Sequence, residues 1–170
     1  MEFGRYGQKN QNNVKRADGL PMSDEATSET KQEKRFVDNG DGTVTDRNLN
    51  LMWKQTDAFQ DNSKFMNWYD CRDYIVRLND QRFAGHRDWR FPNLEEAQSL
   101  YDPSRHIRDM DRFEIFIDPS FSPGGAYSTW TNEERAFGTA VVFFYRHGYE
   151  DLAHKDGISK DTVRPVRSVS

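Results

Sequence analysis

The residues that could do chemistry in this chain are few and widely spaced. Cys71 is the single cysteine, and the four histidines are His86, His106, His147 and His154. They show no HxxxH spacing and no second cysteine accompanies them, so the sequence predicts neither a zinc site nor a thiolate pair. There is also no glycine-rich loop before a helix and no GxSxG turn. We therefore expect no catalytic residue, no bound metal and no cofactor, and hence a protein that is not an enzyme.

A calcium loop is the one metal site that the acidic residues suggest. The segment DNGDG, residues 38–42, crowds two aspartates and an asparagine together. With Gly42 at the sixth position of an EF-hand loop, the first ligand would be Val37, which has no carboxylate. The same composition is typical of a tight β-hairpin turn between Phe36-Val37 and residues 43–45, and this is the interpretation that we prefer.

Two groups of residues suit binding better than catalysis. Residues 130–134, WTNEE, are similar to the Trp-Asn-Asp run with which calcium-dependent lectins hold a metal and a sugar, although the spacing is shifted by one residue. This makes Asn132 and Glu133 candidate ligand-binding residues, and a solvated loop is the alternative. Arg146, His147, Tyr149 and Glu150 cluster at a predicted hairpin tip. Tyrosine and arginine are enriched where interfaces carry binding energy, so this tip is a candidate recognition patch, with a plain exposed turn as the alternative.

Structural roles are expected for Trp89 and the charged residues around it. Arg87, Asp88 and Arg90 flank the tryptophan, and charges beside a buried ring usually brace a loop-rich fold as a buried or half-buried ion network. The segment that follows, Asn93–Tyr101, opens with an asparagine N-cap and has a glutamate three residues later, which predicts a helix with a capping box.

Composition limits the classes of function. The chain has 170 residues, which favours one domain, and carries 24 basic and 28 acidic side chains for a net charge of -4. That balance offers no basic face for nucleic acid. No stretch approaches the roughly 20 apolar residues of a membrane span, and the start of the chain lacks the apolar core of a signal peptide. We therefore expect a soluble, cytoplasmic protein, or an exported one if a leader has been removed.

The expected organisation is a polar tail followed by a compact domain. Residues 1–34 carry six basic and six acidic side chains without periodicity and are predicted to be disordered or bound to a partner. In the domain, residues 35–170, a helix is predicted from Asn62 or Ser63 to about Leu78, and a long excursion over residues 102–125. Strands are predicted at 51–53, 127–131, 139–145, 149–154 and 162–166. Short strands, two helices and then more strands indicate the α+β class.

The residues from Arg35 to Arg167 resemble a known family. RFVDNGDGTVTDRNLNLMW, a helix with a cysteine, LNDQRFAGHRDWRFPNLEEAQSLYD, YSTWTN and TVRPVR follow one another as in the C-terminal domain family of the Legionella collagen-like protein. The resemblance implies a fold like that of C-type lectins and the formylglycine-generating enzyme. It also implies that the first and last strands lie side by side, that two helices flank them, and that Trp53, Trp89 and Trp130 are core positions.

Two departures from the family pattern are informative. Pro165 stands where the family commonly has a cysteine, so the usual bridge to Cys71 cannot form, and the loss of such a bridge typically costs about 2–5 kcal/mol. This suits a reducing compartment. Leu49-Asn50 replaces Thr-Gly, and asparagine tolerates the left-handed conformation that the turn needs. A single cysteine also fails to supply the thiolates that formylglycine-generating enzymes use with copper.

Two functional hypotheses follow. The first is a non-catalytic recognition module of lectin-like fold that binds a glycan or a protein partner through the 102–126 excursion and the late hairpin. The alternative is an accessory structural subunit of a larger multi-subunit assembly, with the tail, residues 1–34, wrapped on a neighbouring chain.

Overall fold

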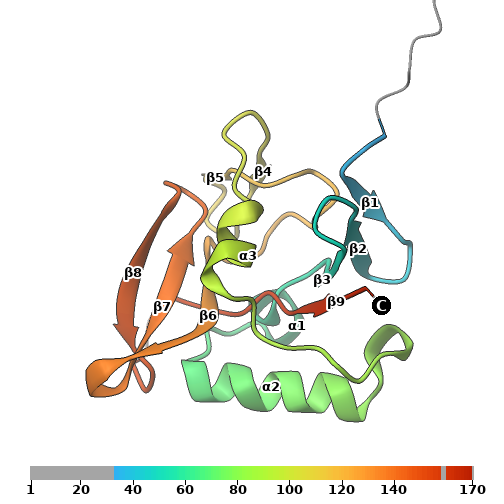
Figure 1. Cartoon of the computed structure of the whole chain (residues 1–170). Coiled ribbons are helices and arrows are strands. Elements are labelled where there is room, and N and C mark those ends of the chain that lie inside the picture. The colour runs from blue at the N-terminus through green and yellow to red at the C-terminus, as the bar shows by residue number, and fades with distance from the viewer. Residues whose placement is uncertain (1–32, 158–159, 170) are drawn as a thin grey trace, which may run out of the picture. The chain divides into compact units, whose positions relative to one another are not determined.

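The computed structural model describes residues 33–157 and 160–169, which form an α+β domain (Figure 1). Its helices and strands are β1 (Phe36–Asp38), β2 (Thr43–Asp46), β3 (Leu51–Lys54), α1 (Ala58–Asn62), α2 (Trp68–Asp80), α3 (Leu94–Ser99), β4 (Ile107–Arg108), β5 (Glu114–Ile115), β6 (Ser128–Arg135), β7 (Thr139–Phe144), β8 (Tyr149–His154) and β9 (Val166–Ser168). Short 3-10 turns lie at Phe83–Gly85 and Ala136–Gly138. The mixed α+β class expected from the sequence is confirmed.

Residues 1–32 lie outside the described part of the chain. The predicted tail, residues 1–34, is therefore described only at Glu33 and Lys34, where Glu33 accepts a hydrogen bond from Arg47 at 3.1 Å. Among the described residues, no helix is long and apolar enough to cross a membrane.

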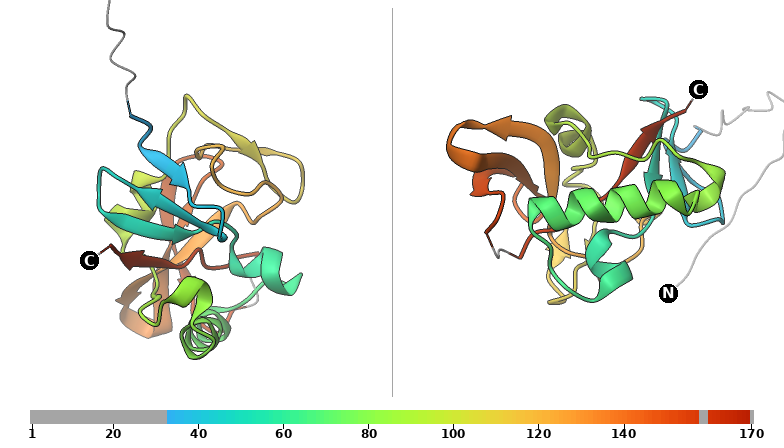
Figure 2. Two further views of the ribbon diagram at one scale, coloured as in Figure 1. Left: turned by 90° about the vertical axis from the view of Figure 1, so that its right-hand side faces the viewer. Right: turned by 90° about the horizontal axis from the view of Figure 1, so that it is seen from below.

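The strands form three antiparallel sheets. The first has the order β1-β2-β3-β9, the second pairs β4 with β5, and the third has the order β6-β7-β8. Figure 2 shows β9 beside β3, with β1 at the far edge of the same sheet. The last strand therefore pairs with the third, with Trp53 opposite Val166, and not with the first as the family resemblance implied. The two ends of the domain still meet in one sheet.

The closing segment differs from the predicted strand over residues 162–166. β9 begins only at Val166, and the preceding residues are extended but divide their hydrogen bonds between several partners. The backbone oxygens of Thr162, Val163 and Pro165 accept from the amides of Trp130, Ala58 and Lys54, at 2.7, 2.9 and 2.9 Å. Because Pro165 has no N–H, it cannot take part in a regular ladder as a donor. The segment is a buried cross-connection between the two larger sheets.

The helix predicted from residue 62 or 63 begins later, at Trp68, and a short helix that was not predicted, α1, precedes it. Asp57 caps α1, which ends at Ser63 with a left-handed backbone, φ 54°. Asn67 then starts α2 by accepting a hydrogen bond from the amide of Asp70. The prediction was wrong about the start because the Asn62-Ser63 pair terminates a short helix and does not begin the long one. The apolar stripe itself is buried along α2, at Trp68, Cys71, Tyr74, Ile75 and Leu78.

Two hydrophobic clusters fill the domain. One lies around α3 and contains Trp53, Phe121 and Phe143, all 2% exposed or less. The other lies along α2, which extends from the three-stranded sheet to the four-stranded sheet (Figure 2), and contains Trp89 and Trp130, 2% and 0% exposed. Five of the thirteen buried residues in each cluster carry aromatic rings, consistent with the 14% aromatic composition.

Candidate functional site

The loop around Trp89 is fixed by local hydrogen bonds. The Asn79 side chain accepts from the Trp89 amide at 2.8 Å and donates to its carbonyl at 2.9 Å. The indole N–H donates to the carbonyl of Phe83 at 3.1 Å. These three bonds tie the loop to the end of α2 and to the turn that follows it, so the buried Trp89 holds the loop in place.

Two of the charged residues beside Trp89 form partly buried ion pairs, which are separate from each other. Arg90 donates to both oxygens of Glu96 at 2.7 Å, and Asp88 accepts from Arg167 at 2.7 and 3.1 Å. Arg87 is exposed. The two pairs connect the loop to different elements. Arg90 connects it to α3 through Glu96, and Asp88 connects it to β9 through Arg167.

The proposed lectin-type pair lies at the edge between β6 and α3. Asn132 is exposed and Glu133 is partly exposed. The Glu133 carboxylate accepts from Arg135 at 2.6 Å and from the amide of Leu94, the first residue of α3, at 3.1 Å. Both donors lower the pKa of Glu133. The carboxylate is thus occupied by protein groups, and within the described residues no group of three or more His, Cys, Asp or Glu side chains could hold a metal.

Arg146 lies at the β7–β8 turn and connects it to the β4–β5 hairpin. Its guanidinium binds Asp109 at 2.6 Å and Asp111 at 2.9 Å. It also lies over the rings of Tyr127, at 4.1 Å, and Phe113, at 4.7 Å. Partial burial disfavours the charge, but the two carboxylates outweigh it and raise the pKa of Arg146. Arg146 therefore holds the two loops together, and its guanidinium contacts two aromatic rings, Tyr127 and Phe113.

A row of rings continues from Arg146 across the end of the three-stranded sheet. Tyr127 stacks on Phe144 at 6.1 Å, Phe144 on Tyr149 at 5.0 Å, and Tyr149 on His147 at 6.1 Å, with interplanar angles of 20–23°. We call this set, with Phe113 and Arg146, the aromatic row: Phe113, Tyr127, Phe144, Arg146, His147 and Tyr149. Cross-strand stacking of this kind also stabilises a sheet. The solvent exposure of the rings therefore decides whether they could also contact a ligand.

The ends of the aromatic row are open to solvent. Phe113 is 61% exposed and Tyr149 is 47% exposed, and His147 is exposed beside them. Glu150, the remaining candidate of the hairpin tip, is exposed and accepts a hydrogen bond from Gln98 at 3.4 Å. The structure thus brings Arg146, His147 and Tyr149 together at one turn, whereas Glu150, opposite Phe143, lies on the other face of β8 and contacts Gln98 near α3. Asn132 and Glu133 lie further along β6, toward its other end.

Three members of the aromatic row were not among the candidates from the sequence. Tyr127 and Phe144 belong to runs that predict strands, and Phe113 belongs to the excursion that was expected to bind. The sequence signal for these residues was the density of aromatic residues in YSTWT and VVFFY. Which rings pair across the strands depends on the strand register, in which Phe144 is opposite Tyr149.

A second polar cluster lies around Asp61, an exposed residue whose carboxylate contacts the buried side chains of Lys54 and Tyr74. Asp61 accepts from Tyr74 at 2.6 Å and Thr56 at 2.8 Å, and pairs with Lys54 at 2.8 Å. Burial lowers the pKa of Lys54, whereas the pKa of Asp61 is lowered because its donors outweigh desolvation. A hollow of about 190 Å³ adjoins this cluster. Since the Asp61 carboxylate already receives three donors, the cluster serves as an internal brace between β3, α1 and α2.

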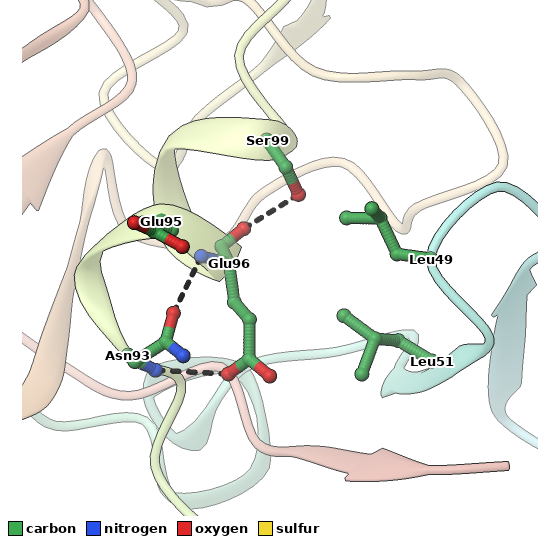
Figure 3. Close-up of a pocket in the computed structure, with 6 residues that line it drawn as sticks. All are labelled: Leu49, Leu51, Asn93, Glu95, Glu96 and Ser99. Atoms are coloured by element: carbon green, nitrogen blue, oxygen red, sulfur yellow. Dashed lines mark hydrogen bonds between the residues drawn. The ribbon is translucent and has the colours of Figure 1, made fainter.

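A larger groove lies on one flank of α3. It has a volume of about 330 Å³ and is lined by Leu49, Leu51, Asn93, Glu95, Glu96 and Ser99 (Figure 3). The helix side is fixed by its capping box, in which Asn93 and Glu96 exchange hydrogen bonds at 2.7 and 2.9 Å. Glu96 is also held by Arg90, so its carboxylate is not available to a ligand, whereas Glu95 is exposed at the rim.

The fold and these surfaces define a small α+β domain with exposed rings and an internal polar brace. The Lcl C-terminal domain family matches residues 42–167, so the chain belongs to this family. Comparison with curated proteins finds no match, and neither does comparison with solved structures.

Proposed function

We propose that this domain is a non-catalytic recognition module of lectin-like fold, and that it binds its ligand at the aromatic row. The ligand class that fits best is a glycan. The observation that carries the proposal is the continuous contact from Phe113 through Arg146 to Tyr149, with both end rings about half exposed or more.

A sugar ring presents apolar C–H groups on its faces and hydroxyl groups at its edges. A complementary site therefore needs aromatic carbon beside hydrogen-bonding groups, and the aromatic row has both. The hydrogen-bonding groups are the imidazole of His147 and the phenol of Tyr149, which are exposed at the same turn. A protein surface is the other ligand that the same residue types can bind, because tyrosine and arginine are common anchors of interfaces.

The row is also preorganised. Arg146 is held by two carboxylates, and Phe144 and Tyr149 are opposite each other in a regular antiparallel pair. A ligand would find the rings already in place, and little side-chain entropy would be lost on binding.

The test is a glycan array and a pull-down with the full chain and three variants. Tyr149→Ala and Phe113→Ala remove exposed ring area and should each weaken retention of the bound glycan about tenfold, equivalent to about 1.4 kcal/mol. Val76→Ala is the matched control, because Val76 is an exposed apolar residue, 52% exposed, on α2. All three should keep the wild-type melting temperature, since exposed sites change stability by only about 0.5 kcal/mol.

Three outcomes are decisive. Retention of a glycan that Tyr149→Ala and Phe113→Ala lose and Val76→Ala keeps supports the proposal. Retention of a protein in the pull-down, with the same dependence on the two rings, places recognition at the row and replaces the glycan with a protein partner. A well-folded sample that retains nothing in either assay contradicts the proposal.

A further inference from the structure

The outer edge of β8 is open. β8 pairs with β7 along all six of its residues without a shift of register, and it is the last strand of the β6-β7-β8 sheet, at the rim of the domain (Figure 1). The opposite edge of this sheet is closed, because the amides of Trp130 and Asn132 on β6 donate to the closing segment and to the loop before α3. Among residues 33–157 and 160–169, no strand pairs with the outer edge of β8. A regular, unpaired edge of this kind is a template for another strand.

Alternate residues of β8 direct their backbone groups to this edge. The carbonyl of Phe144 accepts from the amide of Gly148 at 2.8 Å, so the backbone of Phe144 is directed toward the β8 side of β7. The direction alternates along an antiparallel ladder. The residues of β8 whose backbone groups point away from β7 are therefore Glu150, Leu152 and His154. The amide of Leu152 accordingly donates to the side chain of Asp151, at 2.7 Å.

The side chains of β8 make the strand complementary to itself. Glu150 and His154 lie two residues on either side of Leu152. If a second β8 pairs antiparallel with Leu152 opposite Leu152, each Glu150 lies opposite His154 of the other copy, and a carboxylate faces an imidazole. Registers centred on Glu150 or Asp151 place like charges directly opposite, which destabilises a sheet.

The side chains that this register needs are available. Within the described part of the chain, neither Glu150 nor His154 belongs to an ion pair, and the Glu150 carboxylate accepts only a long hydrogen bond from Gln98, at 3.4 Å. Leu152 is 53% exposed although it lies opposite the buried Val141. An apolar side chain at the centre of an open edge, with an acidic and a basic group placed evenly around it, fits a second copy of the same strand.

We propose that two copies of this chain pair through β8 and join their three-stranded sheets into one, with a two-fold axis between the two Leu152 residues. The outward residues then form three hydrogen-bonded pairs, and each pair exchanges two backbone bonds. The carbonyl of His154 already accepts from the amide of Gly157 at 3.0 Å and would accept a second bond. The same patch is used by both copies, so the association closes at the dimer. A dimer carries two aromatic rows, which lets a repeating ligand be held at two points.

Sedimentation equilibrium of the full chain from about 10 μM to 1 mM tests the association. Edge pairing buries less surface than a standard interface, so we expect a monomer–dimer equilibrium with a dissociation constant of about 0.1 mM. Leu152→Pro removes an outward N–H and leaves the bonds to β7 in place, because an edge strand tolerates proline where the N–H faces solvent. This variant should remain monomeric. Phe113→Ala, which changes only the aromatic row, should dimerise like wild type, and this distinguishes the dimer from ligand binding.

A charge exchange tests the register. His154→Glu places a carboxylate opposite Glu150 of the other copy at two places in the dimer, and should weaken dimerisation about fivefold. The double variant Glu150→Lys with His154→Glu restores opposite charges and should dimerise at least as tightly as wild type. Both positions are exposed, so the melting temperature should stay close to that of wild type. Unchanged association by His154→Glu, or no recovery in the double variant, overturns the proposal.

Cross-linking locates the axis. The Cα atoms of a hydrogen-bonded antiparallel pair lie about 5.5 Å apart, within the range of a disulfide. Leu152→Cys should therefore form a covalent dimer with diamide, which takes up the two electrons and two protons of the thiols. The two copies of Asp151 lie diagonally, about 7–8 Å apart, so Asp151→Cys should cross-link about tenfold more slowly. Equal rates for the two variants overturn the proposal, as do a monomeric wild type at about 1 mM, dimerisation of Leu152→Pro, or species larger than a dimer.

Discussion

The guanidinium of Arg164 lies 3.5 Å from the carboxylate of Asp57, and the two side chains are 3% and 2% exposed. Arg164 also donates to the carbonyl of Gln55 at 2.6 Å. Asp57 accepts from the amides of Gln60 and Ala126 at 2.9 and 2.8 Å. One buried ion pair thus joins the closing segment to the start of α1 and to Ala126, two residues before β6, three parts of the chain that are far apart in sequence.

Asp57→Asn should be among the most destabilising single substitutions in the domain. It leaves the Arg164 charge buried without a partner and replaces one accepting oxygen with an amide donor. We expect the free energy of unfolding to fall by about 3–5 kcal/mol, measured by urea denaturation. Asp73→Asn is the matched control, because its ion pair with Arg72 is more than half exposed, and it should cost under about 1 kcal/mol. Equal losses in the two variants would contradict the prediction.

Asp61 should make stability depend on pH in the acid range. Burial opposes its ionisation, but hydrogen bonds from Lys54 and Tyr74 outweigh this and lower the pKa below its usual 3.8. The contribution of Asp61 is therefore complete above that value and is lost as the pH falls through the folded-state pKa. Urea titrations should show Asp61→Asn well below wild type in stability at pH 7, with the gap closing below pH about 4. A gap that stays constant to pH 2 would disprove this assignment.

Asp57 should make the stability of the domain depend on pH in the opposite direction. Burial raises its pKa, so the folded state binds this proton more readily than the unfolded state does. Its contribution to stability decreases as the pH rises from 3.8 through the folded-state value, which is opposite in sign to that of Asp61. The two carboxylates, four residues apart, are distinguished by the direction of their pH dependence.

Local patterns in the sequence predicted most of the elements. Glycine and asparagine turns indicate the hairpins, Asn93 and Glu96 mark the start of α3, and alternating aromatic and β-branched residues mark β6 and β7. The errors are at places where distant residues decide. α1 is a short helix that needs Asp57 and its buried partners. Residues 162–165 were predicted to belong to one strand, but their backbone oxygens accept from residues of three different elements, and no local pattern encodes that.

The candidate site was only partly predictable for the same reason. Arg146 and Tyr149 were recognisable because they sit at a turn, but the partner Asp109 is 37 residues away along the chain.

Two tyrosines offer a comparison of satisfied and unsatisfied hydroxyl groups. The Tyr145 hydroxyl is buried and has no hydrogen-bond partner among the described residues, whereas the Tyr74 hydroxyl donates to Asp61 at 2.6 Å. Tyr145→Phe should leave stability unchanged or raise it by up to about 1 kcal/mol, because no bond is lost and an unpaired polar atom is removed. Tyr74→Phe should lower it by about 1.5–3 kcal/mol, as for a bond to a charged group. Thermal melting of both variants measures the contrast, and a larger loss for Tyr145→Phe would contradict it.

Arg146→Ala should release the β4–β5 hairpin from the three-stranded sheet. The Asp109 carboxylate, fully buried, would lose its charged partner, and Tyr127 and Phe113 would lose the guanidinium between them. We expect a loss of about 2 kcal/mol in stability and faster amide hydrogen exchange over residues 108–113. Arg146→Lys should be intermediate, since lysine keeps the charge but lacks the planar fork that reaches two carboxylates. His147→Ala, at the next and exposed position, is the control and should leave exchange in the hairpin unchanged. If exchange over 108–113 is the same in all three variants, Arg146 does not hold the hairpin, and the aromatic row is less rigid than the contacts indicate.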